Sequence, residues 1–368
     1  MKILYITTVS STINAFLIPH IEMLINNKNK VDCAAAMDVE ISDILKNKNV
    51  KFFNMPFKRM PLKVSNFIAF KNLLKIQKKY KYDVIHVHTP IASIFGRLLK
   101  VFYPKLKIIY TAHGYHFYKG APKKSWILYY PIEKIMAKLT DVTITINKED
   151  YEITKKKLKP KKCYLVNGVG LDLNKYKQLS KQEKENKRKE LQISEDSFIV
   201  IMIAELNFNK NQIQLIKAME LLKDKYPNIK TLLVGSGPME KLIKNEINNR
   251  NLGDNVKLLG FRKDVNELIN ISDIGVLLSF REGLPRNIME LMANGKKVIA
   301  TNIRGCKDLV SNKEIGELVN VGDYKRTAEL IEKFYFDNPM ISVRNEIRNY
   351  DINFIVSKLY EIYSDLLV

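Results

Sequence analysis

Short runs of β-branched and aliphatic residues alternate with longer amphipathic segments along almost the whole sequence, and this alternation constrains the fold more than any other feature. In the first half, strands are predicted at Lys2–Thr7, Val31–Ala36, Lys51–Met55, Val84–His88, Lys107–Thr111 and Val142–Ile146. Helical segments are predicted between them, for example at Ala15–Asn26, Val64–Tyr80, Ser125–Leu139 and Lys148–Leu158. Apolar strands that alternate with helices predict an α/β fold with a parallel sheet covered on both faces.

The alternation restarts in the second half, after a highly charged stretch at Lys175–Glu195 that is predicted to be a linker. The second series of strands is Phe198–Ala204, Lys230–Gly235, Val256–Leu259, Ile274–Leu278 and Lys297–Ala300, and an amphipathic helix is predicted at Ile352–Leu367. A chain of 368 residues has room for about two domains of roughly 150 residues. Because ligands of open α/β sheets bind at the carboxyl ends of the strands, two such domains are expected to face each other across a cleft that holds the site.

Several classes of protein are not expected from the composition. No apolar run approaches the roughly 20 residues that span a bilayer, and the apolar run at the start stops at Thr7, too early for a signal peptide. Cys33, Cys163 and Cys306 lie far apart, with neither metal-type spacing nor a disulfide framework, which is typical of a reducing compartment. A cytoplasmic protein is therefore expected.

The net charge of +22 is concentrated in one half of the chain. Residues 1–167 hold 30 Lys and Arg against 11 Asp and Glu, whereas the remainder holds 31 against 28. Codon bias would explain many lysines but not the scarcity of acids in one half. The basic residues interleave with large apolar ones such as Phe102 and Trp126. This pattern favours an anionic membrane surface as partner. Lysines that snorkel over helix faces are the alternative, and no nucleic-acid-binding module is recognised.

The strongest local motif is SFREGLPRNIMELMANGKKVIA, residues 279–300. A predicted strand ends in a loop with Glu282 and Gly283, and Pro285 suits the first turn of a following helix. Free backbone N–H groups at that helix start would bind an anion such as a diphosphate. Glu290 falls about one and a half turns into the helix, so the two carboxylates could accept bonds from sugar and ribose hydroxyls. A capped surface helix with two solvated glutamates is the alternative.

This motif resembles the E-x7-E signature of retaining glycosyltransferases of the GT-B fold, family four. Further motifs follow in family order across nearly the whole chain: TAHGYHF (111–117), VNGVGLDLNKY (166–176), LLVGSGP (232–238), VKLLGFRKDV (256–265) and ISDIGVLLS (271–279). The resemblance implies two Rossmann-like domains, with residues 1–167 binding the acceptor and residues 168–350 the nucleotide sugar. Residues 351–368 would form a helix that returns to the first domain.

The resemblance also assigns roles to individual residues. Glu290 would bind the ribose, Glu282 the transferred sugar and Lys210 a donor phosphate, with His113 near the reacting centre. The other donor-binding residues would be Gly235, Gly237, Pro238, Phe261, Arg262, Gly283, Leu284, Pro285 and Arg286. The resemblance implies retention at the anomeric carbon by front-face attack, with a UDP-linked sugar as co-substrate. No metal is expected, because no Asp-x-Asp occurs and cations with backbone donors would hold the leaving-group charge.

Two departures from the family pattern stand out. Glu205, in AELNFNKN, occupies the place of the usual phosphate-binding Arg, and Arg281 or Arg286 could supply the missing charge. The first loop, TTVSSTINAF, lacks the usual Gly-Gly pair. A similar Ser-containing loop, followed as here by Phe16–His20, is found in a subgroup that acts on lipid-linked sugars in capsule and exopolysaccharide assembly. The expected acceptor-side residues are Ser10, Ser11, Thr12 and His116.

All five histidines precede residue 117. His86 and His88 share one face of a predicted strand, an arrangement that would suit a metal centre. The second half of the chain, however, offers no further histidine. We therefore interpret them as polar residues at the carboxyl end of a strand. The expected protein is a glycosyltransferase on the inner face of the cell membrane, with a lipid-linked saccharide as acceptor. A sugar-nucleotide epimerase of the same architecture and an inactive scaffold, favoured only by Glu205, are the alternatives.

Overall fold

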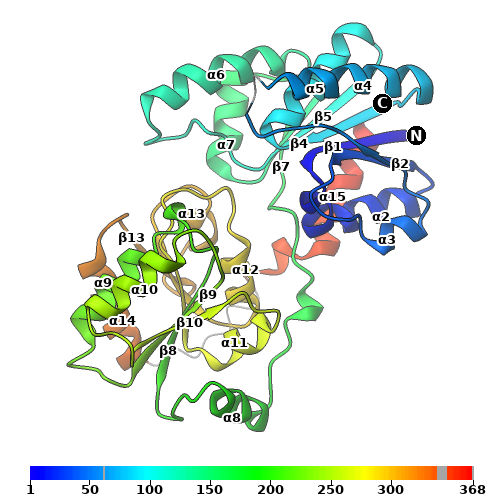
Figure 1. The fold of residues 1–368 in the computed structure, drawn as a ribbon. Helices are drawn as coiled ribbons and strands as arrows, with labels where there is room; N and C mark the ends of the chain where they lie inside the picture. Colours follow the sequence, from blue (N-terminus) through cyan, green and yellow to red (C-terminus); the bar gives the residue numbers. More distant parts are fainter. Residues whose placement is uncertain (61–62, 338–345, 367–368) are drawn as a thin grey trace. The chain divides into compact units, whose positions relative to one another are not determined.

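The computed structural model describes residues 1–60, 63–337 and 346–366 (Figure 1). The chain divides into two compact units. Unit 1 comprises Met1–Gly170 together with Ile352–Val368, and unit 2 comprises Leu171–Asp351. Each unit is built on one parallel β-sheet, so the α/β architecture expected from the alternating pattern is confirmed.

Unit 1 contains a seven-stranded sheet in the order β3-β2-β1-β4-β5-β6-β7. Its strands are β1 (Lys2–Val9), β2 (Lys30–Ala36), β3 (Phe52–Asn54), β4 (Val84–His88), β5 (Lys107–Ala112), β6 (Val142–Thr145) and β7 (Lys162–Leu165). Its helices are α1 (Ser10–Thr12), η1 (Ile13–Leu17), α2 (Ile18–Asn26), α3 (Asp43–Asn47), α4 (Val64–Tyr80), α5 (Pro90–Phe102), α6 (Lys123–Ala137), α7 (Lys148–Ile153), η2 (Thr154–Leu158) and α15 (Ile352–Asp365). The pattern had predicted neither α5 nor β7.

Helices cover both faces of this sheet, which explains why its strands are mostly apolar. In β1, Leu4 and Ile6 pack with α4, α5 and α6, whereas Ile3 and Tyr5 pack with α2 and α15. Helix α15 therefore completes the core of unit 1 although it ends the chain, as the resemblance implied. Leu367, the expected end of this helix, lies outside the described residues.

Unit 2 contains a six-stranded sheet in the order β10-β9-β8-β11-β12-β13. Its strands are β8 (Phe198–Ile203), β9 (Ile229–Val234), β10 (Val256–Gly260), β11 (Ile274–Leu277), β12 (Lys297–Thr301) and β13 (Gly316–Val319). Its helices are η3 (Leu173–Lys175), α8 (Lys181–Glu190), η4 (Phe208–Lys210), α9 (Gln212–Leu222), α10 (Glu240–Asn249), α11 (Val265–Ile271), α12 (Arg286–Ala293), α13 (Cys306–Leu309), α14 (Tyr324–Asp337) and η6 (Arg348–Tyr350). The strand order reverses between β8 and β11, so their carboxyl ends mark the expected ligand position.

The prediction of a linker at Lys175–Glu195 was wrong, because most of this stretch folds as part of unit 2. Helix α8 begins at a capping box formed by Ser180 and Glu183, a motif that satisfies backbone N–H groups at a helix start. It lies against α11, which follows it by more than seventy residues. Charged side chains of α8, which the sequence suggested would face solvent, therefore lie against α11.

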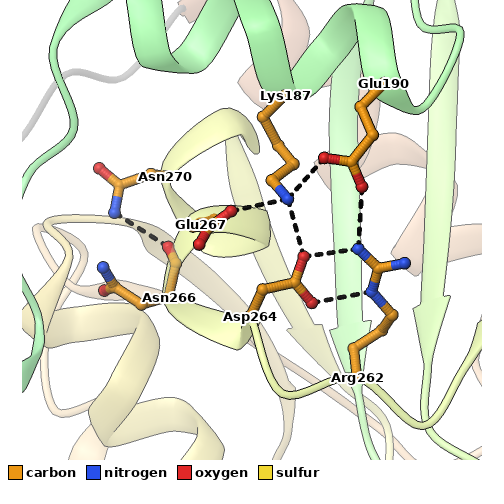
Figure 2. A network of polar contacts seen from close by, with 7 residues as sticks. All are labelled: Lys187, Glu190, Arg262, Asp264, Asn266, Glu267 and Asn270. Carbon is orange, nitrogen blue, oxygen red and sulfur yellow. Dashed lines mark hydrogen bonds and ion pairs between the residues drawn. The ribbon is translucent and has the colours of Figure 1, made fainter.

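Ion pairs hold α8 in this place (Figure 2). The ammonium group of Lys187 lies 2.8 Å from Glu190, 2.9 Å from Asp264 and 2.6 Å from Glu267. Arg262 binds Asp264 through Nε at 2.8 Å and Nη2 at 2.5 Å and also reaches Glu190. These cations lower the pKa of Asp264 well below its ordinary value.

Candidate functional site

The strongest sequence motif lies in unit 2 at the carboxyl end of β11. The chain leaves this strand through a loop and enters α12 with Pro285 at the N-cap. Lys210, from the loop after β8, places its Nζ 2.6 Å from Oε1 of Glu282 in this loop. The structure therefore brings together two of the three predicted catalytic residues, at the carboxyl ends of adjacent strands. An ammonium group carries three donors, so Lys210 can hold Glu282 and a phosphate oxygen together.

Glu290 lies further along α12, with its side chain largely buried. Its Oε1 accepts hydrogen bonds from the hydroxyl of Tyr176 at 2.9 Å and from Nε of Arg286 at 3.2 Å. Burial raises the pKa of Glu290, while Arg286 and Tyr176 oppose the shift. Burial and the Glu290 charge also raise the pKa of Tyr176, which stays protonated and donates. Tyr176 was absent from the predicted site, although it ends the motif VNGVGLDLNKY.

The glycine loop after β9 packs closely against the chain that follows β8. A Cβ atom at Gly235 would lie 2.1 Å from the carbonyl oxygen of Ala204, and one at Gly237 would lie 2.5 Å from that of Leu206. Gly235 also has a φ of +141°, in a region that favours glycine. Close backbone approach therefore explains both glycines, and Pro238 lies exposed after them.

The loop of Glu282 has supports that the sequence analysis missed. Nε of the buried Arg304 donates to the carbonyl oxygen of Glu282 at 3.0 Å. Gly305, with φ +78°, passes so close to Gly283 that a Cβ would lie 2.2 Å from its carbonyl oxygen. Partly buried Leu284 packs against the core. The Arg-Gly pair after β12 was the only sequence signal for this support.

The structure shows the position of Glu205, the first departure from the family pattern, and of the two cations proposed to replace the missing Arg. The exposed carboxylate of Glu205 accepts a hydrogen bond from Nδ2 of Asn207 at 2.9 Å. Of the two candidate replacement cations, Arg286 binds Glu290, whereas the exposed Arg281 makes no side-chain hydrogen bond or ion pair within the described residues.

The predicted nucleobase-side residues behave differently from each other. The guanidinium group of Arg262 is held by Asp264 and Glu190, as described above for the contact of α8 (Figure 2). The neighbouring Phe261 leaves 73% of its surface exposed. Its ring is therefore open to a stacking partner, whereas the guanidinium group of Arg262 is engaged by two carboxylates of unit 2.

The remaining predicted catalytic residue, His113, lies in unit 1 after β5. Its Nε2 lies 2.9 Å from Nδ1 of His88, whose own Nε2 is buried and has no hydrogen-bond partner among the described residues. A buried nitrogen lone pair without a donor costs less free energy than a buried N–H without an acceptor. We therefore assign the proton shared by the two rings to Nδ1 of His88. The proton of His113 is assigned to its own Nδ1. His86 is bound by Tyr363 at 2.6 Å and Thr111 at 2.8 Å. Both strand histidines thus belong to a buried hydrogen-bonded cluster.

Burial keeps these imidazoles neutral. It lowers the pKa of His86 and His88 well below the ordinary value and lowers that of His113 to about 4. His113 can therefore act at neutral pH as a hydrogen-bonding group but not as a cation.

The four acceptor-side residues fall into two groups. The hydroxyls of Ser10 and Ser11 both donate to Asp38, at 2.9 and 2.6 Å. Although desolvation opposes them, these hydrogen bonds lower the pKa of Asp38 to about 2. Thr12 and His116, in contrast, line a cavity of about 290 Å³.

In residues 1–60, 63–337 and 346–366, no group of three or more His, Cys, Asp or Glu side chains could hold a metal ion. Across these same residues, every helix is too short or too polar to span a membrane.

Comparison with known proteins agrees with this arrangement. Residues 2–147 match the family model "Glycosyl transferase 4-like", and residues 183–353 match "Glycosyl transferases group 1". EpsD of Bacillus subtilis, a protein named as a glycosyltransferase, is 36% identical over 91% of this chain and 87% of its own length. The chain belongs to the GT-B glycosyltransferases.

Two other proteins are similar to this glycosyltransferase over nearly its whole length. An Escherichia coli UDP-Gal:alpha-D-GlcNAc-diphosphoundecaprenol alpha-1,3-galactosyltransferase is 27% identical over 94% of this chain and 92% of its own. The crystal structure of Anabaena HepE in complex with UDP has a TM-score of 0.81 at 20% identity, covering 99% of this chain and all of that one. The structural likeness shows a shared fold.

Proposed function

We propose that this glycosyltransferase transfers a hexose or N-acetylhexosamine from a UDP-linked donor to a lipid-diphosphate-linked saccharide, in the synthesis of a cell-surface polysaccharide. The ion pair between Lys210 and Glu282, at the carboxyl ends of β8 and β11, carries this proposal. The E. coli relative, which acts on a diphosphoundecaprenol-linked sugar, supports the acceptor class.

The proposed mechanism uses fixed charges and no metal. Lys210 stabilises the negative charge that grows on the diphosphate as it leaves, with Arg281 or Arg286 as a second cation. Glu282 accepts bonds from the transferred sugar and Glu290 from the ribose. The anomeric configuration is retained through front-face attack, with a donor phosphate oxygen taking the acceptor proton. Neutral His113 contacts the reacting sugar.

A panel of nucleotide sugars, scored by thermal shift and then by transfer, tests this proposal. A ligand at one hundred times its Kd stabilises the folded protein by about 2.7 kcal/mol, so the true donor stands out. We expect UDP sugars to stabilise the enzyme and NMR to show a product of unchanged anomeric configuration. An inverted product would contradict the mechanism. Epimerisation of the donor without acceptor would indicate an epimerase, and an absence of any stabilising nucleotide a scaffold.

We also propose that unit 1 binds reversibly to an anionic bilayer on the inner face of the membrane. The neighbouring helices α4, α5 and α6 cover one face of its sheet and expose large apolar side chains, among them Val64, Phe67, Phe102, Ile127 and Leu128. Lysines lie among them in the sequence. Trp126, expected to contact the membrane, instead packs against Phe117 and donates to the carbonyl oxygen of Tyr118 at 3.2 Å.

Sedimentation with vesicles tests this surface. Each basic residue near an anionic surface contributes about 1 kcal/mol, and salt screens the attraction. We expect binding to anionic vesicles at low salt, release at high salt, and no binding to neutral vesicles. Replacing Lys123, Lys124 and Ile127 together by Ser should weaken binding while leaving the thermal shift with UDP unchanged. Equal sedimentation of the variant and the wild type would refute the role of this surface.

A further inference from the structure

Two adjoining cavities lie in unit 1. The larger, of about 290 Å³, is lined partly by apolar residues, but its wall also includes the polar side chains of Arg59, Thr8, Thr12 and Thr89. The smaller, of about 60 Å³, has mostly apolar walls between α5 and α6. The two cavities share His116 and Tyr129 as wall residues, whose rings stack at 4.5 Å. Together they form a groove, in which the end with Arg59 and the threonine hydroxyls is called the polar end and the end between α5 and α6 the apolar end.

The polar end contains one uncompensated positive charge. Exposed Arg59 makes no hydrogen bond or ion pair with any residue that the structure describes. Opposite it, Thr89 adopts a φ of +63°, which is rare for a β-branched residue and marks a conformation imposed by its surroundings. Its Oγ1 accepts from the N–H of Thr8 at 3.0 Å and donates to the carbonyl oxygen of His88 at 2.5 Å. The wall is therefore fixed, and it suits an anion with several acceptor oxygens.

The apolar end contains no uncompensated charge. Ile94, Ile132 and Leu128 contribute apolar side chains to its wall. Glu133 is also present, but both of its oxygens are bound by Arg97, at 2.8 and 3.0 Å, in a buried pair. Leu128 is 57% exposed, so this end of the groove reaches the apolar surface of α6. An aliphatic chain could therefore pass from the groove toward a bilayer.

We propose that this groove binds the isoprenoid diphosphate of the acceptor, with the diphosphate at Arg59 and the first isoprene units between α5 and α6. The proposal rests on the proposed function, which supplies a lipid-diphosphate acceptor. It assigns Thr12 and His116, two of the predicted acceptor-side residues, to the same site. The charge of Arg59 matches the diphosphate, and the neutral apolar end matches a chain that would otherwise contact water.

Trp126 offers a direct measurement, because it is the only tryptophan. Its ring lies 5.3 Å from that of Phe117, which lines the apolar cavity. Titration with farnesyl diphosphate should change the fluorescence of Trp126 saturably. Inorganic diphosphate and farnesol, each carrying half of the recognised chemistry, should bind at least about tenfold more weakly. No response to farnesyl diphosphate, in a protein that UDP still stabilises, would overturn the groove but not the transferase.

Two pairs of variants separate the ends of the groove. Arg59→Gln should weaken farnesyl diphosphate binding about tenfold or more, since bonds to charged groups are strong, and leave farnesol binding unchanged. Lys58→Gln makes the same charge change outside the groove and should alter affinity less than twofold. Leu128→Ser should weaken binding several-fold, whereas Ile127→Ser, its exposed neighbour, should not. Equal affinities within either pair would overturn the proposal, and urea unfolding followed by Trp126 fluorescence would report that unit 1 of each variant is folded.

Discussion

Acidification from pH 7 to pH 5.5 should destabilise unit 1 selectively, because histidines are buried there in neutral form. His20, His86 and His88 are almost fully buried. Burial lowers the pKa of His20 to about 4 and those of His86 and His88 well below the ordinary value. Below about pH 6.5 the unfolded chain binds protons at these residues while the folded chain does not. The free energy of unfolding must therefore fall as the pH falls through this window.

The magnitude follows from the unfolded-state pKa. Between pH 7 and pH 5.5, a histidine with an unfolded pKa of about 6.5 that stays neutral when folded costs about 1.2 kcal/mol. Three such histidines lower the stability of unit 1 by about 4 kcal/mol, a large part of the roughly 5–15 kcal/mol of an ordinary domain. His113, which is less buried, acts in the same direction. The hydrogen bonds that lower the pKa of Asp38 to about 2 place its titration below this window.

Urea unfolding followed by Trp126 fluorescence measures this change, since Trp126 belongs to unit 1. His20→Gln keeps an N–H donor for the carbonyl oxygen of Val169, which lies 2.8 Å from His20 Nε2. This variant should lose about 1.2 kcal/mol of the pH dependence. Unit 2 contains no histidine, so hydrogen exchange in β8 should change little. A stability of unit 1 at pH 5.5 within about 1 kcal/mol of its value at pH 7 would refute the reasoning.

Four further predictions concern the donor site. Glu290→Ala should abolish detectable transfer and weaken UDP binding about tenfold to a hundredfold by calorimetry; unchanged affinity would remove Glu290 from the site. Lys210→Ala should lose most activity in steady-state assays, whereas Glu205→Gln should be tolerated. Arg286→Ala should raise the donor KM and lower kcat together if it supplies the second cation, and wild-type kinetics would exclude that role. EDTA should leave transfer unchanged, and loss of activity restored by Mn²⁺ would contradict the mechanism.

Most of the strands were predictable from the sequence because they are buried on both faces. β4 has the predicted bounds, and most other predicted strands differ by one or two residues at an end. Burial on both faces requires a continuous apolar run, which is a local pattern that a sequence displays directly. The helix start at Pro285 was similarly local, since proline fits the first turn without losing a hydrogen bond.

The prediction of a linker was wrong and α5 was not predicted, because these segments are helical through contacts with residues remote in the sequence. Helix α8 is polar, and its charges are satisfied by Asp264 and Glu267, residues remote in the sequence. Helix α5 is largely buried, and its Arg97 is bound by Glu133, a residue remote in the sequence. Only tertiary packing supplies the partners that make such segments helical.

In the candidate site, too, the sequence indicated individual residues, whereas their contacts followed from the tertiary structure. Motif order marked Lys210, Glu282 and His113, but no spacing rule says that Lys210 and Glu282 meet across 72 residues. Their contact follows from the adjacency of β8 and β11 in the sheet, where the strand order reverses. The hydrogen bond from His88 to His113, the support of Glu282 by Arg304, and the groove at Arg59 likewise depend on long-range packing. The sequence by itself determined which residue types were present, and the tertiary structure decided which of them touch, because hydrogen bonds and ion pairs act only over a few ångströms.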